Sequence, residues 1–163
     1  FQVWSEPGRG SIFKLFFPAC EVSLTPQGPP LPEAEGRFQG QVLVVDDEPA
    51  VLETTEAALR QMGFSVLCAR DGLEGLEVFR AHQGEIRLAL LDLTMPRMDG
   101  REAFLALRRI RPDLPVLLSS GYNEQESVKG LLGQGLAGFI QKPYLFKDLR
   151  TVVASILTKD GAG

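Results

Sequence analysis

Cysteine, histidine and long apolar runs are scarce in this sequence of 163 residues. Its two cysteines, Cys20 and Cys68, form neither a metal-ligand spacing nor a disulfide framework, which predicts a reducing compartment, by default the cytoplasm. No apolar run reaches the roughly 18 residues that a membrane-spanning helix needs, so we expect no membrane contact. A net charge of −4 without a basic stripe argues against nucleic acid as a partner.

The first 40 residues lack the pattern of a folded domain. The chain begins at Phe1 rather than at methionine and shows no signal peptide, so we expect a piece of a longer protein. Residues 20–40 are rich in proline, glycine and acid, which predicts an extended linker. Residues 1–19 are too few to bury a core by themselves. The main domain is predicted over 41–158, followed by a tail at 159–163.

Short apolar runs alternate with amphipathic stretches after the linker. The runs with β-branched or aromatic residues are 41–45, 64–69, 88–92, 115–120 and 138–142. Between them, apolar side chains recur at helical spacing, as they do from Val51 to Met62. Gly63 is expected to end that helix, and Asp71 with Gly72 to begin the next one. Near-continuous apolar strands separated by helices predict an α/β domain with a doubly wound, five-stranded parallel sheet.

Polar side chains stand where the predicted strands end, which is the edge at which open parallel sheets bind ligands. The first strand ends in Asp46 and Asp47, the third in Asp92, the fourth in Ser119 and the fifth in Lys142. Crowded carboxylates repel one another, and hard oxygen ligands suit Mg²⁺. A carboxylate can also accept a phosphoryl group, and Asp92 is the better candidate because it stands alone on its strand. An Asp-Asp pair alone is more often a helix cap, so the prediction rests on the whole set.

At these residues the sequence resembles the receiver domains of two-component response regulators. The motifs are "VLVVDDE" (42–48), "LLDLTMPRMDG" (90–100), "VLLSSGYNEQ" (116–125) and "GFIQKPY" (138–144). The resemblance implies a flavodoxin-like fold with strand order 2-1-3-4-5. It implies that Asp92 is the phosphoacceptor and that Mg²⁺ is bound by Asp46, Asp47, Asp92 and the backbone carbonyl of Thr94. It implies that Ser119 provides the switch hydroxyl and that Lys142 senses the phosphoryl group. Phe139 would be the aromatic residue whose ring turns inward on activation. It also implies a cis bond between Lys142 and Pro143. Plain core packing is an equal interpretation of Phe139.

The predicted fourth helix departs from a regular pattern. Gly130, Gly133 and Gly135 fall within it, and glycine weakens a helix by about 1 kcal/mol per site. We therefore expect this helix to be short or mobile, which suits a switching surface, although a loose surface helix without that role is the alternative. Ser119 replaces the more frequent threonine and keeps the hydroxyl. The face made by the fourth helix, fifth strand and fifth helix is where the resemblance allows a homodimer.

The head of the chain, "SEPGRGSIFKLFFPA" (5–19), resembles the end of a histidine-kinase ATPase domain. Gly8, Gly10 and Ser11 hold the places of its Gly-x-Gly-Ser/Thr box. With the receiver, this resemblance implies the C-terminal part of a hybrid sensor histidine kinase. The rest of a nucleotide pocket is missing, so we expect neither ATP binding nor kinase activity here. His82 ends an amphipathic helix and is read as a surface residue.

Three functions are compatible with the residues. The first is a phosphorelay module that takes a phosphoryl group from a phosphohistidine, with a histidine kinase core or a histidine phosphotransfer domain as partner. The second is a phosphatase of the haloacid-dehalogenase type. That family places a second aspartate two residues after its nucleophile, whereas this chain has Thr94. The third is a binding module that has lost phosphorylation, although such relatives usually lack the acceptor or the lysine.

Overall fold

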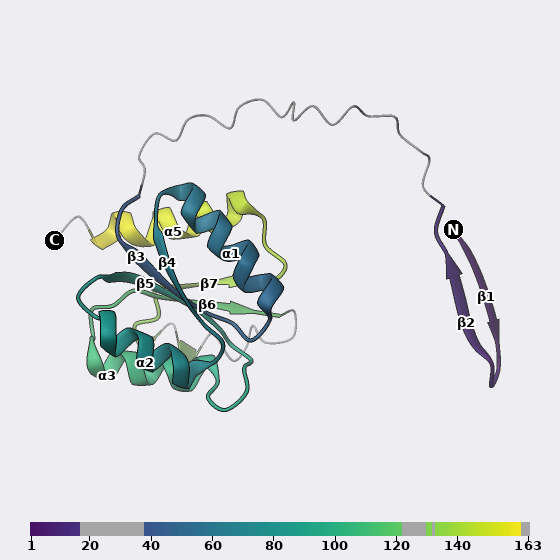
Figure 1. The fold of residues 1–163 in the computed structure, drawn as a ribbon, viewed down its shortest axis with the longest axis horizontal. Coiled ribbons are helices and arrows are strands. Elements are labelled where there is room, and N and C mark those ends of the chain that lie inside the picture. Colours follow the sequence, from purple (N-terminus) through teal and green to yellow (C-terminus); the bar gives the residue numbers. More distant parts are fainter. Residues whose placement is uncertain (17–37, 122–129, 132, 161–163) are drawn as a thin grey trace, which may run out of the picture. The chain divides into compact units, whose positions relative to one another are not determined.

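The computed structural model describes residues 1–16, 38–121, 130–131 and 133–160. The chain divides into two compact units. The first contains β1 (Gln2–Glu6) and β2 (Gly10–Lys14), and the second contains a five-stranded sheet with its helices (Figure 1). Within the described residues, no helix combines the length and the apolar character needed to cross a membrane.

The first unit is an antiparallel hairpin. Its register pairs Val3 with Phe13 and Trp4 with Ile12. Gly8 and Gly10 form the turn with φ of 79° and 93°, a region that glycine enters without steric cost. The apolar side chains are open to solvent, with Trp4 57% and Phe13 68% exposed. The hairpin therefore has strands but no core of its own, and isolated hairpins are marginally stable in water.

The second unit contains a parallel sheet in the order β4-β3-β5-β6-β7. Its strands are β3 (Gln41–Val45), β4 (Ser65–Ala69), β5 (Ile86–Asp92), β6 (Val116–Ser120) and β7 (Gly138–Gln141). Numbered within this unit alone, the order is 2-1-3-4-5. The predicted fold class is confirmed, and β5 lies at the centre of the sheet.

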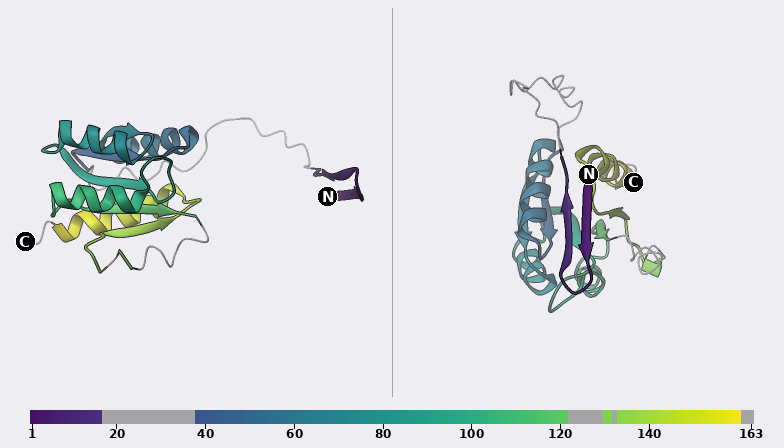
Figure 2. Two further views of the ribbon diagram at one scale, coloured as in Figure 1. Left: turned by 90° about the horizontal axis from the view of Figure 1, so that it is seen from below. Right: turned by 90° about the vertical axis from the view of Figure 1, so that its right-hand side faces the viewer.

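Helices cover both faces of this sheet. They are α1 (Pro49–Met62), α2 (Gly72–His82), α3 (Gly100–Ile110) and α5 (Phe146–Asp160). Figures 1 and 2 show α1 and α5 on one face and α2 and α3 on the other. Alternate residues of β3 feed the two cores: Val42 and Val44 pack with α1 and α5, whereas Leu43 and Val45 pack with α2 and α3. This doubly covered arrangement explains why the strands are continuously apolar.

The helix boundaries follow the predicted signals. Gly63 ends α1 in the left-handed region with φ of 106°, and its N–H donates to the carbonyls of the last turn. Asp71 caps α2, because its side chain accepts hydrogen bonds from two N–H groups of the first turn. Asp99 caps α3 in a capping box with Glu102. Both of the predicted helix signals at Gly63 and Asp71 are confirmed.

The folded unit extends to residues before β3. The Phe38 ring stacks on Phe64 with centroids 5.1 Å apart, and the Phe38 N–H donates to the Met62 carbonyl. The Arg87 guanidinium donates to the carbonyl of Gln39 at 3.0 Å. Residues 38–40 are thus part of this unit. The stretch predicted as a weak fourth helix falls largely on 122–129 and 132, which lie outside the described residues.

Candidate functional site

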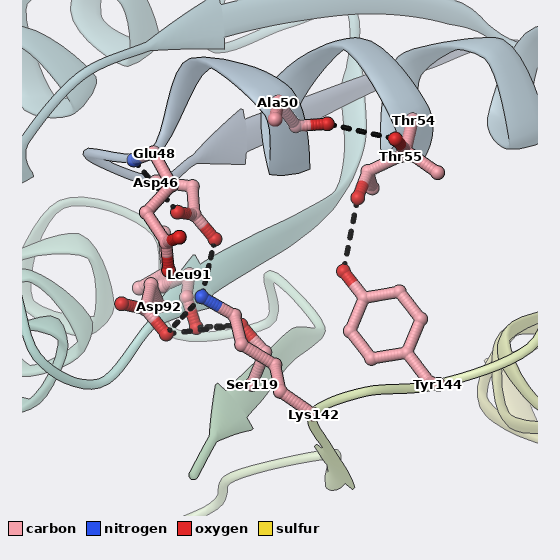
Figure 3. Close-up of polar contacts among 10 residues, drawn as sticks. All are labelled: Asp46, Glu48, Ala50, Thr54, Thr55, Leu91, Asp92, Ser119, Lys142 and Tyr144. Atoms are coloured by element: carbon pink, nitrogen blue, oxygen red, sulfur yellow. Dashed lines mark hydrogen bonds and ion pairs between the residues drawn. The ribbon is translucent and has the colours of Figure 1, made fainter. Parts of the chain in front are cut away.

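The predicted polar side chains meet at one edge of the sheet. Asp46 directly follows β3, Asp92 ends β5, Ser119 lies near the end of β6 and Lys142 directly follows β7. The parallel register pairs Asp92 with Ser119. Since these strands run in the same direction, their carboxyl ends bring the four side chains together, as Figure 3 shows. The sequence-predicted cluster is present in the structure.

The ammonium group of Lys142 lies between two buried carboxylates. Its Nζ is 2.7 Å from Asp46 Oδ2 and 2.8 Å from Asp92 Oδ1. Asp46 is 2% exposed and Asp92 is 6% exposed. The Ser119 hydroxyl is 3.4 Å from Asp92 Oδ1 and equally far from the carbonyl of Leu91. The lysine therefore holds together the ends of two neighbouring strands while it partly compensates their charge (Figure 3).

Burial and the charge of the ion-pair partner shift the pKa values of Asp92 and Lys142 in opposite directions. Burial raises the pKa of Asp92, and the Asp46 and Asp47 charges add to it, while the bond and charge of Lys142 act against them. Burial alone would lower the pKa of Lys142, but its bonds and charge interactions with the two buried carboxylates raise it overall. The ammonium thus stays charged, and Asp92 is a more basic carboxylate than an exposed one.

The donor set fits a hard divalent cation. Asp46, Asp47 and Asp92 each offer a carboxylate oxygen, and these oxygens lie within 4.8 Å of one another. Asp47 is exposed, which leaves room for the waters that Mg²⁺ retains. Asp46 is held in place because its Oδ1 accepts a hydrogen bond from the Glu48 N–H at 3.0 Å. Thr94 is exposed in the loop that follows β5, two residues after Asp92.

The loop after Asp92 is fixed by close backbone contacts. A Cβ on Gly100 would lie 2.1 Å from the carbonyl oxygen of Asp92, so only glycine fits there. Gly72 donates its N–H to the Met98 carbonyl at 3.2 Å. Arg97 adopts a φ of 65°, and its guanidinium pairs with the buried carboxylate of Asp71. This loop therefore has contacts at both ends and in its middle.

Two further features bear on the predictions at β7. Phe139 is 38% exposed, and in register it pairs with Leu118, the neighbour of Ser119. Phe139 is thus one of the large apolar residues that remain partly open to solvent. The bond between Lys142 and Pro143 is cis, as the resemblance implied.

Sequence reasoning missed a pair of hydroxyl groups beside the site. The hydroxyls of Thr55 on α1 and Tyr144 after β7 are 2.9 Å apart. Thr55 is 1% exposed and lies within the stretch 51–62, where apolar side chains recur at helical spacing. A threonine within such a face was the available signal, because a buried hydroxyl needs a partner. A cavity of about 530 Å³ lies next to the pair, and it is lined by α1 residues, Gly121, Lys142 and Pro143.

Comparisons with a family model and with known sequences give results that agree with one another. The family model described as "Response regulator receiver domain" matches residues 42–154. The chain is 32% identical over 163 residues to the Sensor kinase CckA of Brucella abortus (strain 2308), a match that covers 95% of this chain and 17% of that protein. It is 35% identical over 128 residues to the Response regulator MprA of Mycolicibacterium vanbaalenii, covering 76% of this chain and 54% of that protein. The chain thus spans about half or less of these relatives.

Solved structures show the same fold. A receiver domain protein (CheY-like) from Methanospirillum hungatei JF-1 superimposes with a TM-score of 0.68 at 28% identity, over 77% of this chain and 100% of that one. A chain of the CheX-CheY-BeF3-Mg+2 complex from Borrelia burgdorferi gives 0.69 at 28% identity, over 72% of this chain and 89% of that one. The described sheet and its helices are therefore shared with these proteins.

Proposed function

Because the chain belongs to the family of response regulator receiver domains, we propose that Asp92 accepts a phosphoryl group from a phosphohistidine in a two-component phosphorelay. The observation that carries the proposal is the contact of one ammonium group with two buried carboxylates. Lys142 Nζ lies within 2.8 Å of both Asp46 and Asp92, at the edge where parallel sheets bind ligands. A phosphoryl acceptor needs a carboxylate, a nearby cation and a hydrogen-bond donor, and Ser119 supplies the donor.

The proposed reaction is a transfer between a nitrogen and an oxygen. An oxygen of Asp92 attacks phosphorus, the N–P bond of the phosphohistidine breaks, and its electron pair returns to the imidazole ring. Burial raises the pKa of Asp92 and so makes its carboxylate a stronger nucleophile, while the Lys142 charge favours the ionised form. As the O–P bond forms, the Lys142 ammonium and the Ser119 hydroxyl turn from Asp92 Oδ1 to the phosphoryl oxygens.

Magnesium is the proposed cofactor. Asp46, Asp47, Asp92 and the backbone carbonyl of Thr94 would hold it, and the oxygens of the three carboxylates already lie within 4.8 Å of one another. When bound, Mg²⁺ supplies positive charge that offsets the charge of the transferring phosphoryl group. Asp46 contributes further by its fixed orientation, since the Glu48 N–H holds one of its oxygens.

The output we propose is a change in protein–protein contacts. The Ser119 hydroxyl moves toward the phosphoryl group, and the ring of Phe139, a residue that is 38% exposed, turns inward. The affected face includes β7 and α5, which is also where a homodimer would form. The proposed donor or acceptor partner is a histidine kinase core or a histidine phosphotransfer domain, and the proposed location is the cytoplasm.

The parent protein is proposed to be a hybrid sensor histidine kinase. The match to the Sensor kinase CckA covers 95% of this chain and therefore includes residues outside the receiver unit. In the first unit, apolar side chains such as Phe13 and Trp4 are more than half exposed, which fits strands that pack within a larger domain. We accordingly assign 1–19 to the end of an ATPase domain, 20–40 to a linker whose last residues, 38–40, pack on the receiver, 41–158 to the receiver and 159–163 to a tail.

A small-molecule phosphodonor tests the reaction without a partner. The protein is incubated with phosphoramidate and Mg²⁺, and intact mass is recorded. We expect the gain of one phosphoryl group, its loss in Asp92→Asn and in EDTA, and its retention in the control Asp113→Asn, an exposed acid outside the cluster. Phosphorylation that persists in Asp92→Asn would overturn the assignment. Turnover of p-nitrophenyl phosphate would favour the phosphatase alternative instead.

A further inference from the structure

A hydrogen bond links the segment that follows β7 to the helix that follows the paired acids. The hydroxyls of Thr55 and Tyr144 are 2.9 Å apart, although 89 positions separate these residues in the sequence. Thr55 is 1% exposed and Tyr144 is half-buried. Figure 3 shows the pair beside the site, with Thr55 on α1 and Tyr144 on the segment that carries Lys142. Both hydroxyls thus find a partner in each other.

The segment that carries Lys142 has limited support from the sheet. It follows β7, which among the described strands lies at the edge of the sheet and pairs with β6 alone. The Lys142 N–H donates to the Ser120 carbonyl at 2.8 Å, which fixes the backbone on that side. On the other side, a cavity of about 530 Å³ is lined by Lys142, Pro143 and Tyr144 together with residues of α1. Tyr144 packs against the core under α1 and α5, and its hydrogen bond to Thr55 adds a specific polar contact between this segment and α1.

We propose that the Thr55–Tyr144 hydrogen bond is a positioning contact for Lys142 and sets the placement of its ammonium between Asp46 and Asp92. The inference rests on the proposed function, in which Lys142 binds the transferring phosphoryl group. Tyr144 is two residues beyond Lys142, and α1 begins three residues after Asp46. The bond thus fixes the lysine segment relative to the helix that begins next to the paired acids. Thr55 and Tyr144 are not among the residues proposed above to react with the phosphoryl group or to bind the metal.

Single-atom changes test this role. Tyr144→Phe and Thr55→Val each remove one hydroxyl and keep the shape of the side chain. We expect each to slow phosphorylation by phosphoramidate about fivefold, the factor that corresponds to the net worth of one hydrogen bond. The double variant should be no slower than either single variant, because one interaction is lost in all three. Magnesium affinity, measured by calorimetry with Mg²⁺ alone, should stay within about twofold, since the carboxylates are untouched.

Two controls separate positioning from stability. Thr55→Ser keeps the hydroxyl and should restore the wild-type rate, whereas Thr54→Val removes an exposed hydroxyl that bonds within α1 and should leave the rate unchanged. The side-chain ¹H–¹⁵N signal of the Lys142 ammonium is recorded in wild type and variants. A shift of this signal in Tyr144→Phe and Thr55→Val, and none in Thr54→Val, supports the proposal.

Two results would overturn the inference, and neither coincides with failure of the proposed function. Wild-type rates and an unmoved Lys142 signal in Tyr144→Phe and Thr55→Val, with only the unfolding free energy lowered, would make the bond purely structural. Additive slowing in the double variant would show that the two hydroxyls act separately. A wild-type protein that takes no phosphoryl group contradicts the proposed function, while the Lys142 signal still decides whether the bond positions the ammonium.

Discussion

Replacing Lys142 by methionine should destabilise the fold and at the same time strengthen Mg²⁺ binding. The ammonium lies 2.7 Å from Asp46 Oδ2 and 2.8 Å from Asp92 Oδ1, and both carboxylates are less than a tenth exposed. Methionine keeps much of the apolar length of the side chain and removes the charge. Two buried carboxylates then face each other without the cation that compensates them.

The magnitude follows from the burial of the pair. Removing one partner of a buried ion pair typically costs about 3–5 kcal/mol, because the remaining charge is left uncompensated. The Lys142 side chain is 18% exposed, so solvent reaches part of it, and we take the lower end of this range. We expect Lys142→Met to lower the free energy of unfolding by about 3 kcal/mol in EDTA. In saturating Mg²⁺ the loss should fall to about half, since the cation compensates the same carboxylates.

The assay is urea unfolding of wild type and Lys142→Met, each in EDTA and in Mg²⁺, with calorimetry for the affinity. By linkage, a smaller loss of stability in Mg²⁺ must appear as tighter Mg²⁺ binding by the variant. Lys147→Met, a change at an exposed lysine of α5, serves as the control and should alter neither quantity. Equal losses with and without Mg²⁺, or weaker Mg²⁺ binding by Lys142→Met, would refute the idea that lysine and metal compensate the same charges.

Three further changes test the folded unit by urea unfolding. Asp92→Asn in EDTA should leave the free energy of unfolding unchanged or raise it. A carboxyl whose pKa is raised by folding destabilises the native state when it is ionised. A clear decrease in the free energy of unfolding of Asp92→Asn would contradict this expectation. Phe38→Ala should lower the free energy of unfolding by about 2 kcal/mol, because the contact with Phe64 is lost. An unchanged free energy would show that Phe38 lies outside the folded unit. Gly100→Ala should lower the free energy of unfolding by more than about 2 kcal/mol, because the added Cβ would collide with backbone atoms. Gly84→Ala is the control: it has open space around it and should lower this free energy by less than about 0.5 kcal/mol. Equal decreases in the two variants would refute the steric argument.

The position of the site could be predicted from the sequence because it depends on strand ends. The end of an apolar strand is visible in the sequence: Asp46 follows β3 and Asp92 is the last residue of β5, while Lys142 directly follows β7. Parallel pairing then places these ends at one edge, whatever the details of the helices. The strand order came from the resemblance, since alternation alone is compatible with more than one doubly wound order.

The contacts that support the site could not be predicted in the same way. Thr55 meets Tyr144 across 89 positions, and this contact depends on the rotation of α1 and on the path of the chain after β7. Arg97 reaches Asp71 from a φ of 65°, a conformation that no helix or strand pattern indicates for an arginine. Both contacts depend on the path of a loop, and the first depends also on the rotation of a helix; propensity and periodicity encode neither.

The charge balance of the site gives a physical reason for its composition. Three carboxylates and one ammonium leave two net negative charges in a largely buried cluster, which is the charge that one divalent cation neutralises. With the cation bound, an arriving phosphoryl group would again make the cluster negative. The nearest mobile donors, the Ser119 hydroxyl and the Lys142 ammonium, would then be drawn from Asp92 toward the new oxygens. Because Lys142 also contacts Asp46, the proposed phosphorylation would loosen a link between the end of β7 and the end of β3.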